Sequence, residues 1–320
     1  MTPASEVTLR AVAFVAANKP AAEALGTALA ELTPDPDAFA LAMRRGLASL
    51  ADPEYHAGQE RIAPGIGLVH GVRWPLLAAV SRTFRMATRH DPATPLLFVA
   101  DRLFDEPELE PRWFAFGLLE RTLGSETERT WQLLRRAARE SGDWITVDSL
   151  AHPYGKGILS ESFRWAELEQ LAYSPSRWER RLVGSTIATI PAVDRRRGRE
   201  PGVAAHALPL LAELMGDDQP DVQKALAWAY RSLTYVDMDA TVSALQSETE
   251  RAAATNDGYR AWVIRDSLAK LEPDTADRLR RRLTGIRKHA GTPSTSDASV
   301  TAIRFGGLSD PATLPEHPLA

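Results

Sequence analysis

The chain has 320 residues, 44% of them hydrophobic and 25% charged, a composition typical of a soluble globular protein. Cysteine is absent, which excludes disulfide bonds and thiolate chemistry and fits a reducing compartment. The formal net charge of -4 argues against a uniformly basic nucleic-acid-binding domain, although clustered arginines could still form a positive stripe.

The N-terminal sequence MTPASEVTLR lacks the basic start and the apolar core of a signal peptide. No uninterrupted apolar run approaches the ~20 residues that are needed to cross a bilayer. We therefore expect a cytoplasmic protein with no membrane partner.

Apolar residues recur at helical spacing through almost the whole chain, and strand patterns are nearly absent. Proline or small polar residues precede many of the periodic segments, as Ser174-Pro175 and Gln219-Pro220 do, which is typical of helix starts. The pattern predicts an all-α chain, with amphipathic helices at 38–50, 113–123, 130–140, 178–190, 206–215 and 222–233.

Two segments interrupt the helical pattern. Residues 59–74 are rich in glycine and are predicted to form a loop. The segment from Ala290 onward is rich in Ser, Thr, Pro and Gly, and we expect it to be disordered or loosely attached. The predicted organisation is therefore an N-terminal helical extension, a repeat domain and a tail, at residues 1–55, 56–289 and 290–320.

A weak internal repeat runs through the repeat domain. The segment that begins at Pro175 resembles the one that begins at Pro220, and aligning them places Leu182 opposite Leu226. Helix pairs that recur at intervals of roughly 35–50 residues are typical of a HEAT-like helical repeat solenoid. Such a solenoid would present a curved, concave face for binding.

Trp144 and Asp148 are four residues apart, so on a helix they share one face. An aromatic ring beside a carboxylate suits a cation, such as a charged purine or the sugar cation that it leaves behind. Taken singly, the tryptophan is more typical of a core residue, and the aspartate of a surface or capping residue.

Further candidates follow on later predicted helices. Arg181 alone would be a salt-bridge partner, and Trp228 alone a core residue. The basic run that contains Arg195 and Arg197 is either a solvated loop or a DNA contact. Lys224, one helical turn before Trp228, is a second candidate DNA contact.

Familiar cofactor and metal motifs are absent. HPYGKGIL lacks the first glycine and the Ser or Thr of a P-loop, and GIGLVHG lacks the glycine spacing of a dinucleotide site. The histidines do not fall at metal-binding spacing, and no G-x-S-x-G elbow occurs. We therefore predict no metal and no cofactor.

Three segments together resemble the AlkD-type DNA alkylation repair family of HEAT-like DNA glycosylases. DWITVDSL resembles its W-D-x-V-D segment, RWERRLVGSTI its W-x-x-R segment, and VQKALAWAYRSL its Q-K-A-x-x-W segment. The resemblance implies that Asp148 is the catalytic carboxylate, that Trp144 and Trp228 contact the damaged nucleotide, and that Arg181 contacts DNA. In this sequence Ile145 and Thr146 stand where the family usually has its second acid.

The resemblance also implies the activity. The enzyme would be a monofunctional glycosylase that excises cationic N3- or N7-alkylated purines from duplex DNA without flipping the base into a pocket. The aspartate would stabilise the oxocarbenium-like sugar and position water. We expect a monomer whose partner is duplex DNA that contains alkylated purines.

Two other functions on the same scaffold stay open. One is a non-catalytic binder of DNA structure, and the other is a protein-interaction solenoid that has lost DNA binding. The retained Asp148 favours the enzyme, whereas the acidic balance favours the interaction solenoid.

Overall fold

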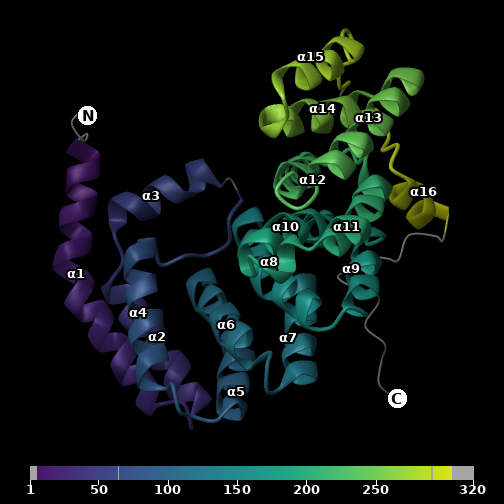
Figure 1. Cartoon of the computed structure of the whole chain (residues 1–320). Coiled ribbons are helices and arrows are strands. Elements are labelled where there is room, and N and C mark those ends of the chain that lie inside the picture. The colour runs from purple at the N-terminus through teal and green to yellow at the C-terminus, as the bar shows by residue number, and fades with distance from the viewer. Residues whose placement is uncertain (1–5, 64, 290, 305–320) are drawn as a thin grey trace, which may run out of the picture. The chain divides into compact units, whose positions relative to one another are not determined.

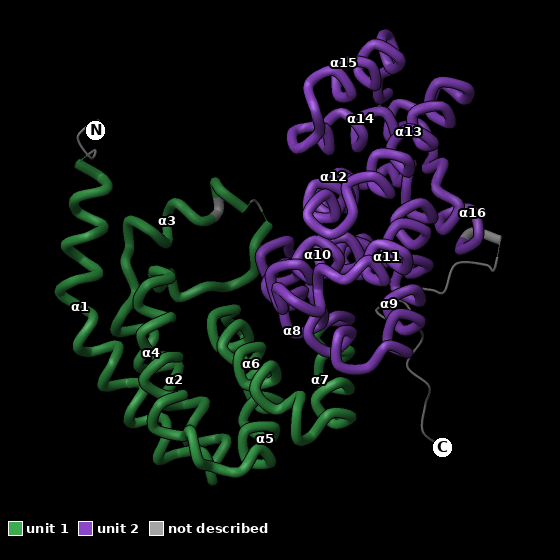
Figure 2. Tube along the Cα trace, in the orientation of Figure 1, with its two compact units in different colours: residues 1–137 green, residues 138–320 purple. Residues whose placement is uncertain are grey.

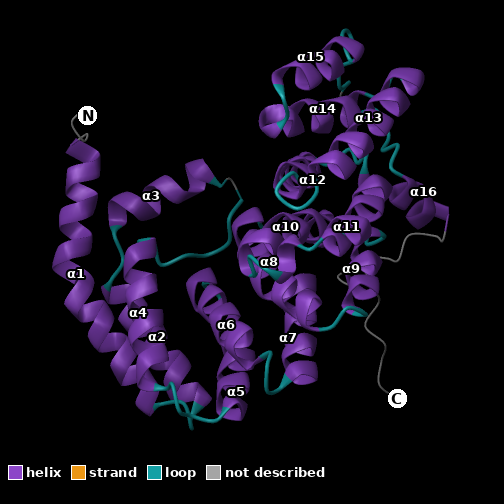
Figure 3. Ribbon diagram, viewed as in Figure 1, coloured by secondary structure: helices purple, strands orange, loops and turns teal. Residues whose placement is uncertain are grey.

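The computed structural model describes residues 6–63, 65–289 and 291–304. Over this part of the chain the protein consists of sixteen α-helices and two 3-10 turns, with isolated bridges but no strand (Figures 1 and 3). The predicted all-α class is confirmed. In the same residues, no helix combines the length and the hydrophobicity that crossing a membrane requires.

The chain divides into two compact units, residues 1–137 and 138–320, with the boundary inside α7 (Figure 2). The first unit contains α1 Glu6–Glu31, α2 Pro36–Ser49, α3 Pro53–Ile62, α4 Trp74–Ala87, α5 Ala93–Leu103, α6 Leu109–Thr122 and most of α7 Thr127–Glu140.

Proline and aspartate start two helices of the first unit as the sequence pattern indicates. Asp35 and Asp52 cap α2 and α3 with their side chains, and a proline follows each of them. The core contains an aromatic cluster in which Phe84 lies 5.7 Å from Phe39 and 5.3 Å from Phe114, measured between ring centroids. This unit therefore has a hydrophobic core of its own, to which α1 adds by packing along α4.

The loop predicted at 59–74 is shorter in the structure, because α3 continues to Ile62. The rest of the loop is held by the buried carboxylate of Glu110. This group accepts the backbone N–H of His70 at 3.0 Å and that of Gly71 at 2.8 Å. One buried acid thus satisfies N–H groups of this glycine-rich segment, and backbone bonds from Asp52 to Gly71 and from Leu109 to Leu68 hold it further.

The second unit has two layers of helices. One row consists of α8 Trp144–Ser160, α10 Arg177–Val193, α12 Pro220–Leu233 and α14 Gly258–Ser267, each packed on the next. The other row consists of α9 Arg164–Ala172, α11 Pro201–Leu214, α13 Met238–Thr255 and α15 Pro273–Arg282. This alternation is the arrangement expected of a helical repeat.

Helices of the first row run parallel to one another. The Thr189 hydroxyl of α10 donates to the Ala151 carbonyl of α8 at 3.2 Å, and one turn earlier in α10 Ser185 contacts Asp148 of α8, which also lies one turn before Ala151. Between α10 and α12 the approach is closest at Gly184, where a Cβ would lie 2.8 Å from the carbonyl carbon of Ala225. Arg231 near the end of α12 pairs with Asp266 near the end of α14 at 2.7 Å, so all four helices begin on the same edge of the second unit.

The segment predicted to be a disordered tail differs from that expectation where it is described. Residues 297–304 form α16 Asp297–Arg304, which packs on α11. Ala298 is fully buried, and Asp297 accepts a hydrogen bond from Arg251 at 2.7 Å. Ala290 and residues 305–320, which belong to the same expected tail, lie outside the described residues.

Candidate functional site

The site is built on the first turns of α8, α10 and α12. Asp143 caps α8 by accepting the backbone N–H and the hydroxyl of Thr146, at 2.8 and 2.6 Å. Trp144 is then the first residue of the helix, and Asp148 follows one turn later on the same face. Both side chains are partly exposed, so the local sequence places an aromatic ring and a carboxylate together at the surface.

Three hydrogen bonds fix the carboxylate of Asp148. The Arg181 guanidinium donates through Nε at 3.1 Å and through Nη2 at 2.7 Å, one bond to each carboxylate oxygen. The hydroxyl of Ser185 adds a bond of 2.6 Å to Oδ1. A carboxylate held by a bidentate arginine and a hydroxyl has a fixed orientation, and the group remains 22% exposed.

Each nitrogen of the Arg181 guanidinium donates a hydrogen bond to an acceptor within the protein. Its side chain is only 6% exposed, and its remaining nitrogen, Nη1, donates to the carbonyl oxygen of Asp221 at 2.7 Å. The sequence pattern assigned this residue to a DNA contact, with a salt bridge as the alternative. In the structure it forms the salt bridge with Asp148 and ties α10 to the start of α12.

Ser185 was not recognised in the sequence. It lies four residues after Arg181 and therefore on the same face of α10, which is the one signal that could have identified it. Its side chain is fully buried against Asp148.

Lys224 and Trp228 share one face of α12, the next helix of the row. Lys224 is exposed and Trp228 is half-buried. A second lysine, Lys288, donates to Gln223 at 2.9 Å and lies 4.3 Å from the centroid of the Trp262 ring. Burial, and then the positive charge of Lys224, lower the pKa of Lys288. Two cations are thus held close together beside the start of α12, and Lys288 was missed in the sequence.

Arg195 and Arg197 lie elsewhere. They follow the C-terminal end of α10, whereas Arg181 is in its first turns. At about 1.5 Å of rise per residue, Arg195 is roughly 20 Å along the helix axis from Arg181. The backbone N–H of Arg197 donates to Asp194 at 2.9 Å, and such bonds, from Arg197 and Arg196, lower the pKa of that aspartate. The structure does not bring this basic run to Asp148.

The arrangement can bind and stabilise a cation next to an anionic polymer. Asp148 provides a fixed negative charge beside the Trp144 ring, and Lys224 and Lys288 provide positive charges near the same edge. Among the described residues, no cluster of His, Asp or Glu side chains is suited to hold a metal ion.

Comparisons with known proteins identify a family by its sequence model and a shared fold by structure. The family model described as DNA alkylation repair enzyme matches residues 43–271. A solved structure from Enterococcus faecalis, described as a predicted DNA alkylation repair enzyme, superimposes with a TM-score of 0.56 at 12% identity. The match covers 70% of this chain and 97% of that one, and it demonstrates a shared fold. No curated protein sequence matches the chain.

Proposed function

Because the chain belongs to the family of DNA alkylation repair enzymes, whose model spans residues 43–271, we propose that it is a DNA glycosylase. Its substrates would be cationic N3- or N7-alkylated purines in duplex DNA. The observation that carries the proposal is the carboxylate of Asp148, fixed by Arg181 and Ser185 at a partly exposed position beside Trp144.

The proposed chemistry needs one carboxylate. An alkylated N3 or N7 makes the purine positively charged, so it leaves without needing a proton from an acid. Departure of the base leaves an oxocarbenium-like sugar, which a carboxylate near C1′ stabilises as in glycoside hydrolysis. Asp148 would also orient the attacking water by accepting its hydrogen bond. A fixed carboxylate is preorganised for this charge, since it need not reorient as the bond breaks.

The surface position of the site supports cleavage without base flipping. Asp148 and Trp144 are partly exposed on the face of α8, where a DNA backbone could reach them without inserting a nucleotide. Trp144 and Trp228 would pack on the sugar and backbone beside the lesion, and Lys224 would hold a phosphate. We place Arg195 and Arg197 outside this contact, because they lie at the far end of α10.

The proposed function is tested by incubating the purified protein with a duplex that carries a single N7-methylguanine. We expect free N7-methylguanine to be released, together with an abasic site and no strand cleavage. Tight binding that weakens with salt but releases no base would instead support a non-catalytic DNA binder, because phosphate contacts alone give such salt dependence. Absence of both base release and DNA binding would instead support a protein-interaction solenoid.

We expect the Lys224→Gln variant to affect DNA binding and the Arg181→Gln variant to affect the rate of base release. Lys224→Gln should weaken DNA binding and reduce the slope of log K against log salt by about 0.9, the value for one lost phosphate contact. Arg181→Gln should leave that slope unchanged and lower the release rate at saturating enzyme by up to about 10²-fold, since Asp148 loses its orienting partner. The measurements are binding titrations at several salt concentrations and single-turnover release.

A reversed result for Arg181 would change its role. If Arg181→Gln lowered the salt slope and left the saturating rate intact, the residue would bind phosphate, as the family motif implies. The Arg181→Lys variant serves as a control, because it keeps the charge but cannot form both bonds to Asp148.

A further inference from the structure

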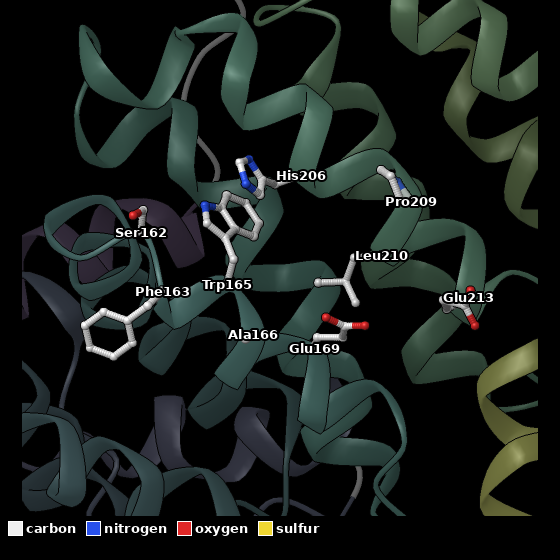
Figure 4. A pocket seen from close by; sticks show the side chains of 9 residues that line it. All are labelled: Ser162, Phe163, Trp165, Ala166, Glu169, His206, Pro209, Leu210 and Glu213. Carbon is white, nitrogen blue, oxygen red and sulfur yellow. The ribbon is translucent and has the colours of Figure 1, made fainter.

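The second row of helices in the second unit contains a cavity away from Asp148. It lies between α9 and α11 and has a volume of about 390 Å³ (Figure 4). Trp165 and His206 line one part, Glu169 lies beside Leu210, and Glu213 lies apart from them, farther along α11. The cavity thus combines aromatic rings, an apolar wall and two carboxylates.

The aromatic part of the cavity consists of two stacked rings. The rings of Trp165 and His206 stack with their centroids 5.4 Å apart and their planes 15° apart. His206 is held in place by its Nδ1, which lies 2.7 Å from the carbonyl oxygen of Gly202. An indole face that lines an open cavity attracts planar cations through its electron-rich ring.

The carboxylates of the cavity form no ion pair with the basic side chains described nearby. Among the described residues, neither Glu169 nor Glu213 has a basic nitrogen within 4 Å. Glu213 instead accepts a hydrogen bond of 3.5 Å from the Tyr173 hydroxyl. Burial, and then the negative charges of Glu213 and Glu169, raise the pKa of Tyr173. The cavity is therefore a local region of negative charge.

Arginines near the cavity are already engaged. Arg164 is buried and pairs with Glu161 at 2.5 Å and with Glu167 at 3.3 Å. Arg251 pairs with Asp297 at 2.7 Å. Neither arginine forms an ion pair with Glu169 or Glu213, although the hydrogen bond to Asp297 and, less strongly, the charge of Glu213 raise the pKa of Arg251.

We propose that the cavity between α9 and α11 is a docking site for an arginine side chain presented by a basic segment of a partner protein. Arginine fits because its planar guanidinium can stack on an indole face while its N–H groups donate to carboxylates. The chain itself uses this stacking elsewhere, since the Arg177 guanidinium lies 4.6 Å from the Trp178 ring centroid. Phe163, 58% exposed beside the cavity, offers apolar surface to the residues that flank the arginine.

The location separates this site from the proposed DNA contact. The cavity is built by the second row of helices, and Asp148 and Lys224 stand on the first row. A partner bound between α9 and α11 would leave the edge that carries Asp148 open. The inference therefore does not depend on glycosylase activity, and its test is a binding measurement.

The test uses a fluorescein-labelled twelve-residue peptide of Gly and Ser with three arginines, beside the same peptide with citrulline in place of arginine. Fluorescence anisotropy should show that the wild-type protein binds the arginine peptide and binds the neutral peptide more weakly. The double variant Glu169→Gln, Glu213→Gln should weaken binding of the arginine peptide by about fivefold, as expected for the loss of two exposed ion pairs. Trp165→Phe, which keeps an aromatic ring in the fold, should weaken it less.

A matched control removes two other exposed acids of the same unit. The double variant Asp239→Asn, Glu272→Gln changes the net charge equally and should leave the affinity unchanged. Equal weakening by both double variants would overturn the proposal, because the peptide would then sense only overall charge. N-acetylarginine amide competing as strongly as the peptide would also overturn it in favour of a small-cation site. Base release should be unchanged in both double variants.

Discussion

The Asp148→Asn variant should release N7-methylguanine from duplex DNA about 10²–10³-fold more slowly than the wild-type protein. Asparagine has nearly the same shape and can still accept a hydrogen bond from Arg181 or Ser185, so the fold should persist. What disappears is the negative charge that would stabilise the sugar cation. The measurement is single-turnover base release at saturating enzyme, with the melting temperature as a check of folding.

Binding and chemistry should separate in this variant. DNA affinity should stay the same or rise, because a negative charge is removed from the proposed path of the phosphates. Asp218→Asn is a matched control, since it makes the same chemical change at a half-buried acid of the same unit and should keep the wild-type rate. Release by Asp148→Asn at the wild-type rate would assign the chemistry to another group.

The Arg260→Leu variant should lose about 3–5 kcal/mol of unfolding free energy, the range for breaking a buried ion pair from one side. Arg260 is 2% exposed and pairs with Glu248 and, at 3.3 Å, with Asp257. Its Nη2 also donates to the Met215 carbonyl at 2.8 Å, which ties α14 to the segment that precedes α12. Leucine would leave two buried carboxylates without their cation, and urea unfolding monitored by circular dichroism measures the loss.

Arg282→Leu provides the comparison for this change. Arg282 pairs with Glu250 at 2.8 Å, but both side chains are more than half exposed. Water and salt screen such a pair, so its loss should lower the free energy of unfolding far less than loss of the Arg260 network does. If the two variants lost equal free energy of unfolding, burial of the Arg260 network would add nothing to stability and the prediction would be wrong.

Local signals in the sequence located many of the elements. Helical periodicity predicted an all-α chain, and Ser176 caps α10 where the preceding Ser and Pro residues indicated a helix start. The four-residue spacing of Trp144 and Asp148 placed them on one face of α8, because this relation depends only on helix geometry. Helix caps and the residues that share a helix face depend on the local sequence alone, so they can be predicted without knowing how the helices pack.

Relations between elements were harder to predict. The sequence presents Arg181 as a charge, and only the packing of α8 on α10 assigns it to Asp148. The same packing gives Ser185 its contact. Lys288 is 65 residues from Gln223, the residue to which it donates, so no local pattern could reveal it. Residues 297–304 of the expected tail are helical, with Ala298 buried in tertiary contacts that composition does not record.

The parallel first row of the second unit has an electrostatic consequence. A helix dipole places about half a positive elementary charge at the N-terminus, through N–H groups that lack partners within the helix. Since α8, α10, α12 and α14 begin on one edge, their four dipoles point the same way and reinforce one another there. Their C-terminal ends carry the opposite sign at the other edge. The net charge of -4 is therefore a poor guide to the field that a phosphate would meet beside Asp148 and Lys224.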